Sequence, residues 1–220
     1  MEKEKLNEIL ENHELWLNNK GGKRADLSGV NLRYADLRYA DLYNADLRYA
    51  NLKGADLRNI NLNNANLKCA DLYNADLMDT DLYNANLTGS NLTGSNLNNA
   101  NLTNIKTNMY TSGYNLACPE EGSFIGYKKA GGYIIKLLIL EDSKRNSATT
   151  LKCRCDKAKV LDIEKIDTCE KIENTPSDYD INFIYRVGEI VKVEDFDENR
   201  WNECSSGIHF FMNKENAINY

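Results

Sequence analysis

The first half of the chain owes its fold to residues 25–104, which read ADLSGVNLRYADLRYADLYNADLRYANLKGADLRNINLNNANLKCADLYNADLMDTDLYNANLTGSNLTGSNLNNANLTN. Sixteen leucines occupy every fifth position from Leu27 to Leu102, and Asp or Asn precedes each of them. An uninterrupted fixed period is typical of repeat architectures. The sequence therefore predicts a solenoid over this stretch.

A period of five residues excludes both regular secondary structures. A helix turns about 100° per residue, so leucines five residues apart would spread around its surface and form no apolar face. In a flat strand they would alternate between the two faces, because five is odd. The backbone must therefore turn a corner once per repeat to keep every leucine on one side.

The repeats resemble the pentapeptide-repeat family, whose unit is a small apolar residue, Asp or Asn, Leu and two variable positions. The motif is followed at residues 25–27, 35–37, 45–47 and 75–77, and the small position departs from Ala at Val30, Ile60, Thr80, Ser90 and Ser95. The resemblance implies a right-handed quadrilateral β-helix with four repeats per coil and with the Leu and small positions inside. Sixteen repeats then imply about four coils.

Residues twenty apart stack in such a coil, which predicts columns of like side chains. We expect an asparagine ladder, and an aspartate column beside two arginines. We also expect the Asp and Asn side chains to satisfy turn amides at the corners, a role that explains this column without a bound metal. The ladder comprises Asn44, Asn64, Asn84 and Asn104, and the aspartate column comprises Asp36, Asp56 and Asp76 beside Arg38 and Arg58.

Composition divides the chain into three expected parts: a capping helix in residues 1–24, the β-helix in residues 25–107 and a compact α+β domain in residues 108–220. The first part carries an apolar stripe at helical spacing, which predicts a helix over residues 4–18 that covers the first coil. The third part shows apolar runs typical of a mainly antiparallel sheet. The expected strands are 132–140, 150–155, 157–163, 181–187, 189–193 and 207–211. A closing helix is expected to start after Asn213, whose side chain is a good N-cap, and to run to Tyr220.

Charge and composition limit the partners. The 220 residues include 33 acidic and 27 basic side chains, a formal net charge of −6, which disfavours general binding to nucleic acid or membrane surfaces. No apolar run approaches the roughly 20 residues that span a bilayer, and the N-terminus lacks the order of a signal peptide. We therefore expect a cytoplasmic protein with reduced cysteines, no membrane association and no cofactor.

The third part resembles an uncharacterised domain that is fused to pentapeptide repeats in bacterial and phage proteins. No activity is assigned to that domain, so the resemblance implies a fold unit without a function. The residues that carry it are Ser147–Thr150, Cys153–Cys155, Ala158–Leu161, Asn199–Trp201, Glu203–Cys204 and Gly207–Phe211.

Three kinds of chemistry are conceivable in the third part. A zinc site would need several thiols and an imidazole, but the usual Cys-x2-Cys spacing is absent, so buried free thiols are favoured; the candidate ligands are Cys118, Cys153, Cys155, Cys204 and His209. A nucleophilic thiol, Cys204 or Cys153, would need His209 as its base. The segment Lys144–Thr150 has a composition suited to phosphate, although a solvated loop is favoured.

Function remains open between two main classes. The leading hypothesis is a non-enzymatic interaction or scaffold protein with an unidentified protein partner, whose candidate contact residues are Tyr34, Arg38, Tyr39, Arg48 and Tyr49. An ordinary solvated solenoid surface is the plainer alternative, and the aromatic positions also permit a homodimer. The competing hypothesis is an enzyme or a binder of small, phosphate-containing ligands, with a pocket that joins Arg154, Arg200, Cys204 and His209.

Some proteins with the same repeats inhibit topoisomerases by imitating duplex DNA. The charges of this chain disfavour that function. The repeats contain nine acidic and six basic side chains, a net charge of −3. Duplex DNA carries one negative charge per about 1.7 Å of axis without positive interruption. A mixed surface over about four coils therefore fits this function poorly.

Overall fold

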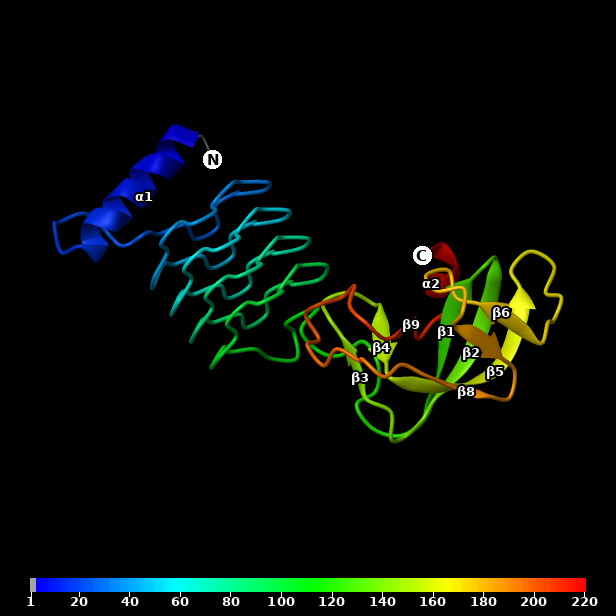
Figure 1. The fold of residues 1–220 in the computed structure, drawn as a ribbon. Coiled ribbons are helices and arrows are strands. Elements are labelled where there is room, and N and C mark those ends of the chain that lie inside the picture. Colours follow the sequence, from blue (N-terminus) through cyan, green and yellow to red (C-terminus); the bar gives the residue numbers. More distant parts are fainter. Residues whose placement is uncertain (1–2) are drawn as a thin grey trace. The chain divides into compact units, whose positions relative to one another are not determined.

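The computed structural model describes residues 3–220, which divide into two compact units, one ending at Asn115 and the other beginning at Leu116 (Figure 1). The described part of the chain is mainly β, with a helix near its start. None of its helices is long and apolar enough to cross a membrane.

Helix α1, Lys3–Leu17, confirms the helix expected at the N-terminal end. Its buried residues are Leu6 and His13, which belong to the expected apolar stripe. The Nδ1 atom of His13 accepts a hydrogen bond of 3.0 Å from the backbone N–H of Ala25, the first residue of the repeats. The helix therefore satisfies a backbone donor of the solenoid, as a cap should.

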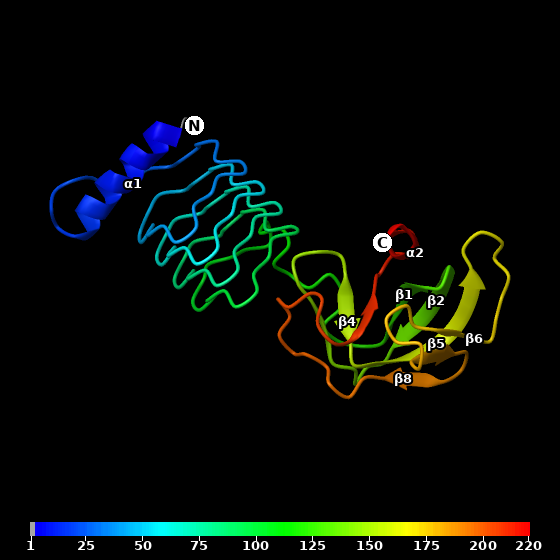
Figure 2. The ribbon, with the colours of Figure 1, turned by 45° about the horizontal axis from the view of Figure 1, so that its top comes forward.

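The repeats stack through parallel bridges between residues twenty apart, beginning at Asp26 and Asp46 (Figure 2). Each bridge is supported by backbone hydrogen bonds, such as those from Leu27 N to Asp46 O (2.7 Å) and from Asp46 N to Ala25 O (3.0 Å). Fifteen of the sixteen leucines are buried. The ladder continues past residue 107 to Ser112, which pairs with Asn91.

Each corner is a turn that imposes its own sequence requirement. The N–H three residues after a leucine donates to that leucine's carbonyl, as from Val30 N to Leu27 O (3.2 Å). The residue two after each leucine has a positive φ in all sixteen repeats. This combination is the geometry of a type II turn, which explains why Gly or Asn fills eleven of these positions.

The Asp and Asn column performs the expected capping role. The Oδ1 atom accepts the backbone N–H two residues on, as from Arg38 N to Asp36 (3.2 Å). Amide ladders also run along this column, and this was not expected: they join Asn61 to Asp41, Asn91 to Asp71, Asn96 to Asp76 and Asn101 to Asp81.

The expected ladder of Asn44, Asn64, Asn84 and Asn104 is formed only in part. Its one rung among the described residues runs from Asn84 Nδ2 to Asn64 Oδ1 (3.1 Å). These four asparagines have positive φ angles and occupy turn corners, whereas the Asp and Asn column lies directly in the hydrogen-bonded ladder. The bridged column therefore provides the more regular stack of side chains.

The second unit contains three antiparallel sheets and a short helix. The largest sheet has the order β1-β2-β5-β8, the second has the order β3-β4-β9, and β6 pairs with β7. The strands are β1 Phe124–Ala130, β2 Tyr133–Ile139, β3 Arg145–Ser147, β4 Cys153–Cys155, β5 Lys157–Lys165, β6 Asn174–Pro176, β7 Ile184–Arg186, β8 Ile190–Lys192 and β9 Ile208–Phe210, followed by helix α2 Lys214–Asn219.

The two larger sheets share one apolar core, and Tyr127 of β1 bridges to Phe211 just after β9. The core includes Ile135, Val160 and Phe210. Helix α2 starts as the sequence predicts, since the Asn213 side chain accepts the N–H of Glu215. Strands β1, β3 and β6 were not among those expected from the sequence.

Candidate ligand pocket

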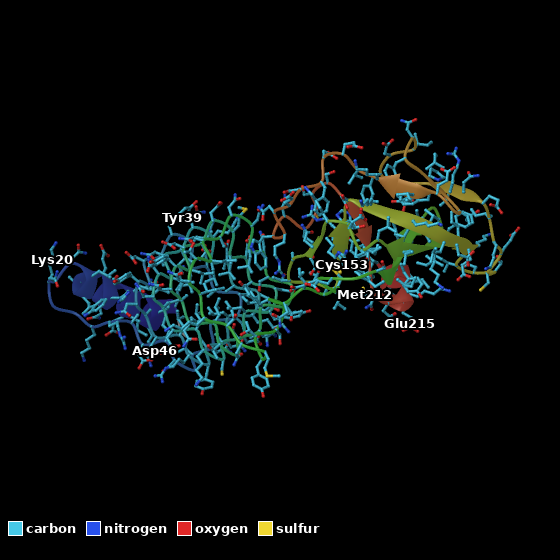
Figure 3. The ribbon with its side chains drawn as sticks, turned by 90° about the horizontal axis from the view of Figure 1, so that it is seen from below. Lys20, Tyr39, Asp46, Cys153, Met212 and Glu215 are labelled. Carbon is cyan, nitrogen blue, oxygen red and sulfur yellow. The ribbon has the colours of Figure 1, made fainter. Side chains whose placement is uncertain are left out.

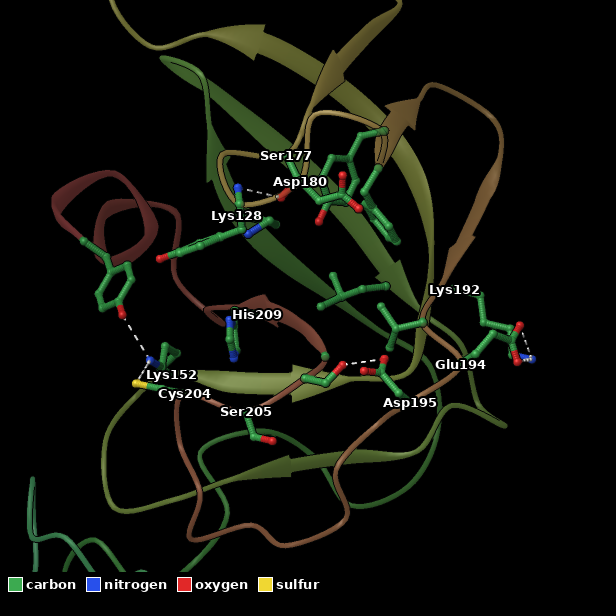
Figure 4. Close-up of a pocket in the computed structure, with 18 residues that line it drawn as sticks. Lys128, Lys152, Ser177, Asp180, Lys192, Glu194, Asp195, Cys204, Ser205 and His209 are labelled. Carbon is green, nitrogen blue, oxygen red and sulfur yellow. Dashed lines mark hydrogen bonds and ion pairs between the residues drawn. The ribbon is translucent and has the colours of Figure 1, made fainter.

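The second unit contains a pocket of about 620 Å³ (Figure 4). Its walls come from five parts of the chain that are distant in the sequence: strand β1, the chain just before β4, the turn between β6 and β7, the segment that runs from the end of β8 to β9, and Tyr220 after α2. The residues that matter for its chemistry are Lys128, Lys152, Asp180, Tyr185, Asp195, Cys204, His209 and Tyr220.

Lys128 reaches the pocket from a core position. It lies in the middle of β1 and is only 8% exposed. Its Nζ atom lies 6.0 Å from the centre of the Tyr185 ring, and no hydrogen bond or ion pair to it occurs among residues 3–220. Burial lowers the pKa of Lys128, and although Asp178 opposes this shift, the positive charge of Lys152 adds to it.

Lys152 lies on another wall of the pocket and is 5% exposed. Its Nζ atom donates to the Tyr220 hydroxyl (3.0 Å) and lies 3.8 Å from Cys204 Sγ. Burial alone would lower the pKa of Lys152, but the hydrogen bond to Tyr220 and the negative field of Glu203 raise it overall. Lys152 is therefore the firmly charged cation of the pocket.

His209 projects into the pocket from β9, between the buried residues Ile208 and Phe210, as strand alternation predicts. Burial and the nearby cations Lys152 and Lys128 lower its pKa to about 4. The imidazole is consequently neutral at pH 7. Its Nε2 atom is buried and has no hydrogen-bond partner in the described part of the chain.

Carboxylates line the other walls. Asp195 accepts a hydrogen bond of 2.6 Å from Ser206 Oγ, and Asp180 accepts one of 2.9 Å from Asn182 N. Neither of them forms an ion pair with the two lysines within residues 3–220. Cationic and acidic side chains both line the pocket, and two of them, Lys192 and Glu194, form an ion pair of 3.1 Å (Figure 4).

The structure brings together only half of the expected site. Cys204 and His209 line the pocket, but Arg154 and Arg200 do not. Arg154 is buried and donates to the backbone carbonyls of Ser206 (3.0 Å) and Asn199 (2.9 Å). Arg200 likewise donates to a carbonyl, that of Ser147 (2.8 Å). Both guanidinium groups therefore brace backbone segments.

The expectation of a solvated loop at Lys144–Thr150 is wrong. Strand β3 occupies part of this segment, and Ser147 is buried. The Arg145 guanidinium donates to the carbonyls of Gly122 (2.6 Å) and Leu140 (2.7 Å). These bonds occupy the cation that a phosphate group would need.

The cysteines do not assemble into a metal site. No group of three or more His, Cys, Asp and Glu side chains in residues 3–220 has the geometry to hold a metal ion. Cys153 and Cys155 are fully buried, and the pKa of each thiol is raised, that of Cys153 chiefly by its neighbour Cys118 and that of Cys155 chiefly by burial. Cys153 is therefore no candidate nucleophile, whereas Cys204 is exposed but contacts Lys152 in place of His209.

The candidate contact residues of the repeats lie at the surface, where Figure 3 shows Tyr39 at the outer edge. Tyr34, Tyr39 and Tyr49 are 70%, 74% and 62% exposed, and their φ angles are 57°, 61° and 58°. A bulky residue at positive φ is uncommon. Each of these tyrosines therefore occupies a turn position where Asn or Gly would be less strained.

The candidate arginines pair with aspartates. Arg38 contacts Asp36 (2.7 Å) and Asp56 (3.4 Å), and Arg58 contacts Asp56 (2.7 Å) and Asp76 (3.5 Å), so arginines interleave the aspartate column as expected. The hydrogen bond from Arg38 lowers the pKa of Asp36 to about 2. Arg48 is paired in the same way with Asp46, at 2.6 Å.

Comparisons with known protein families match both the repeats and the second unit. The profile described as "Pentapeptide repeats (8 copies)" matches residues 25–64, 45–82 and 65–104, and that described as "Family of unknown function (DUF5758)" matches residues 114–217. Comparison with curated proteins gave no match.

Two similar solved structures are also pentapeptide-repeat proteins. The protein alr5209 from Nostoc PCC 7120 is 36% identical over 46% of this chain and 80% of its own, with a TM-score of 0.41. Rfr23 from the cyanobacterium Cyanothece 51142 is 40% identical over 41% of this chain and 65% of its own, with a TM-score of 0.23. On the evidence of its repeats, the chain belongs to the pentapeptide-repeat family.

Proposed function

We propose that the second unit is a binding module for a small anionic ligand. The observation that carries this proposal is the pair Lys128 and Lys152. Both are less than a tenth exposed, both line one pocket, and neither forms an ion pair among the described residues. An unpaired buried charge is costly, and an anion in the pocket would offset that cost.

Calorimetric titration of the full chain with phosphate, sulfate and small carboxylates tests this proposal. We expect saturable binding that weakens with added salt. Lys152→Gln should reduce affinity by at least about tenfold, because a charge-assisted hydrogen bond contributes about 1.5–3 kcal/mol. Lys136→Gln is the matched control, since Lys136 is exposed on β2 and lies outside the pocket. Equal affinity in both variants would reject the proposal.

A second function is supported by the tyrosines of the repeats. We infer that Tyr34, Tyr39 and Tyr49 contribute to a protein-binding surface, because these exposed aromatic rings occupy a turn conformation that Asn or Gly would adopt with less strain. The groove between α1 and the first repeats, lined in part by Tyr39 and Tyr43, continues this surface. A second copy of the chain is one such partner.

Sedimentation analysis of the wild type and of a triple Tyr→Asn variant tests the homodimer. Asn occupies the equivalent turn position at Asn44 and Asn64 with the same positive φ, so the variant should fold. A concentration-dependent mass in the wild type that is lost in the variant is the expected result. Two monomeric proteins at high concentration would exclude self-association through these residues.

DNA mimicry remains the weaker alternative. Interleaving by Arg38 and Arg58 neutralises the carboxylate column, and this supports a solvated or protein-binding face over an imitation of phosphates. The stacking of residues twenty apart, together with the family, supports a right-handed quadrilateral β-helix of about four coils in residues 25–107. Under this proposal, α1 covers its first coil.

A further inference from the structure

Lys128 stands where the strand pattern calls for an apolar residue. Gly126, Lys128 and Ala130 are the buried residues of β1, while the adjacent Lys129 is exposed. The residue that pairs with Lys128 on β2 is Ile135, which is fully buried. The side chain therefore leaves the apolar core and ends in the pocket.

No hydrogen bond or ion pair within residues 3–220 compensates the charge of Lys128, and the field of Asp178 opposes the effect of burial only in part. The nearby carboxylate Asp178 accepts a hydrogen bond of 2.7 Å from the backbone N–H of Gly131, and it forms no ion pair with Lys128 within residues 3–220. The centre of the Tyr185 ring lies 6.0 Å from Lys128 Nζ. Burial of this side chain shifts the equilibrium towards the free amine, which is the nucleophilic form.

The two pocket lysines have opposite electrostatic environments. The pKa of Lys128 is lowered by burial, and the pKa of Lys152 is raised overall by its hydrogen bond to Tyr220 despite burial. Titratable neighbours whose pKa values are pushed apart take different chemical roles. Lys152 is suited to hold an anion, and Lys128 is suited to attack an electrophile.

We propose that Lys128 forms an imine with the carbonyl group of a small anionic aldehyde or 2-oxo acid, while Lys152 binds the anionic group. This inference rests on the anion-binding function proposed above and names its ligand class. It assigns a covalent role to a side chain that simple anion binding would use only as a charge.

The reaction balances without an oxidant or reductant. The lone pair of the neutral Lys128 Nζ attacks the carbonyl carbon, a C–N bond forms, and the carbonyl oxygen takes up a proton. The nitrogen then loses its protons as the hydroxyl leaves as water, and a C=N bond results. Tyr220 accepts its hydrogen bond from Lys152, so its own hydroxyl proton is available to the departing oxygen in the same pocket.

Reductive trapping in the full chain tests the imine. The protein is incubated at pH 7 with glyoxylate and sodium cyanoborohydride, and peptide mapping by mass spectrometry gives the rate at each lysine. We expect Lys128 to be labelled severalfold faster than Lys129, because burial lowers the pKa of Lys128 and so raises its free-amine fraction. Lys129 is the matched comparison, being adjacent, exposed and hydrogen-bonded to the Ile218 carbonyl.

Variants separate positioning from reactivity. Lys152→Gln should slow labelling of Lys128 by glyoxylate much more than labelling by propanal, which carries no charge. Lys128→Arg should abolish the fast label, and Lys129→Arg should retain it. If Lys128→Arg fails to fold, the ratio of Lys128 to Lys129 labelling in the wild type still decides the question.

The outcomes distinguish this inference from the function on which it rests. Labelling of Lys128 no faster than that of Lys129 in the folded wild type would overturn the imine. If calorimetry without cyanoborohydride then shows glyoxylate binding that depends on Lys152, the anion-binding function survives alone. If neither labelling nor binding occurs, both proposals fail.

Discussion

Replacing His13 tests whether α1 caps the repeats. Phenylalanine can keep the ring stacking on Trp16, whose centroid lies 5.3 Å from that of His13, but it removes the acceptor of the Ala25 N–H. His13 is fully buried, so its loss leaves the Ala25 N–H without a hydrogen-bond acceptor. Such a donor costs about 1–3 kcal/mol, so His13→Phe should reduce the free energy of unfolding of the first unit by that amount.

The same contact predicts a pH dependence with a definite sign. Burial is the main cause that lowers the pKa of His13 from 6.5, with Arg24 adding to it and Asp41 opposing it. The unfolded chain therefore binds a proton before the folded protein does. Stability should fall as the pH drops below about 6.5 and should level off below the folded pKa. His13→Phe should lack this fall.

Tryptophan fluorescence can follow the unfolding of the first unit separately from that of the second. The chain has two tryptophans, Trp16 in α1 and Trp201 in the second unit. In a Trp201→Phe background, urea unfolding followed through Trp16 reports on the cap at pH 7.5, 6.5 and 5.5, values that bracket the ordinary histidine pKa of about 6.5. Equal stability of the His13→Phe variant at pH 7.5 would refute the capping role, and an unchanged fall towards pH 5.5 would refute the assignment of the titration.

Three further predictions test other features. Arg58→Met should raise the pKa of Asp56 towards its ordinary value, because the hydrogen bond from Arg58 is the main cause that lowers it; carbonyl NMR titration would measure this, and an unmoved pKa would contradict it. Gly54→Ala should destabilise the repeats more than Gly29→Ala does. Both glycines have positive φ, but only the new Cβ at position 54 would meet a tyrosine ring, at 2.5 Å. Equal thermal midpoints of the two variants would argue against this close packing. Lys128→Met should stabilise the second unit, by about 1–3 kcal/mol, because it removes an uncompensated buried charge; a loss of stability in urea unfolding would show that the ammonium is satisfied.

The leucine period was sufficient to predict a coil with one corner per repeat, because neither a helix nor a flat strand keeps leucines five residues apart on one side. Stacking at twenty residues followed from the resemblance to pentapeptide-repeat proteins. The turn requirement was less visible, although its signal is present: Gly or Asn fills most positions two residues after a leucine. Three of the five exceptions, Tyr34, Tyr39 and Tyr49, are bulky aromatic residues at exposed corners. Departures from a structural requirement are positions where function is worth seeking.

The second unit was harder to predict because its shorter strands hold too few residues to show a period. Strand β3 has three residues, and its charged and polar composition indicates a loop until the bonds of Arg145 to distant carbonyls are known. Arg154 was expected at a site for the same reason, since the sequence shows a charge but not the carbonyls that it satisfies. Burial of an arginine is cheap only when such acceptors surround it.

Lys128 was not among the site residues expected from the sequence, although the residues next to it indicate that it is buried. In Phe124–Ala130 the alternation places Gly126, Lys128 and Ala130 on one face, so a lysine shares a face with small core residues. Arg154 and Lys128 are both buried cations, yet the first donates to two carbonyls and the second has no hydrogen-bond partner in the described chain. A bound partner for the pocket would account for this difference, because the protein alone compensates only one of the two charges.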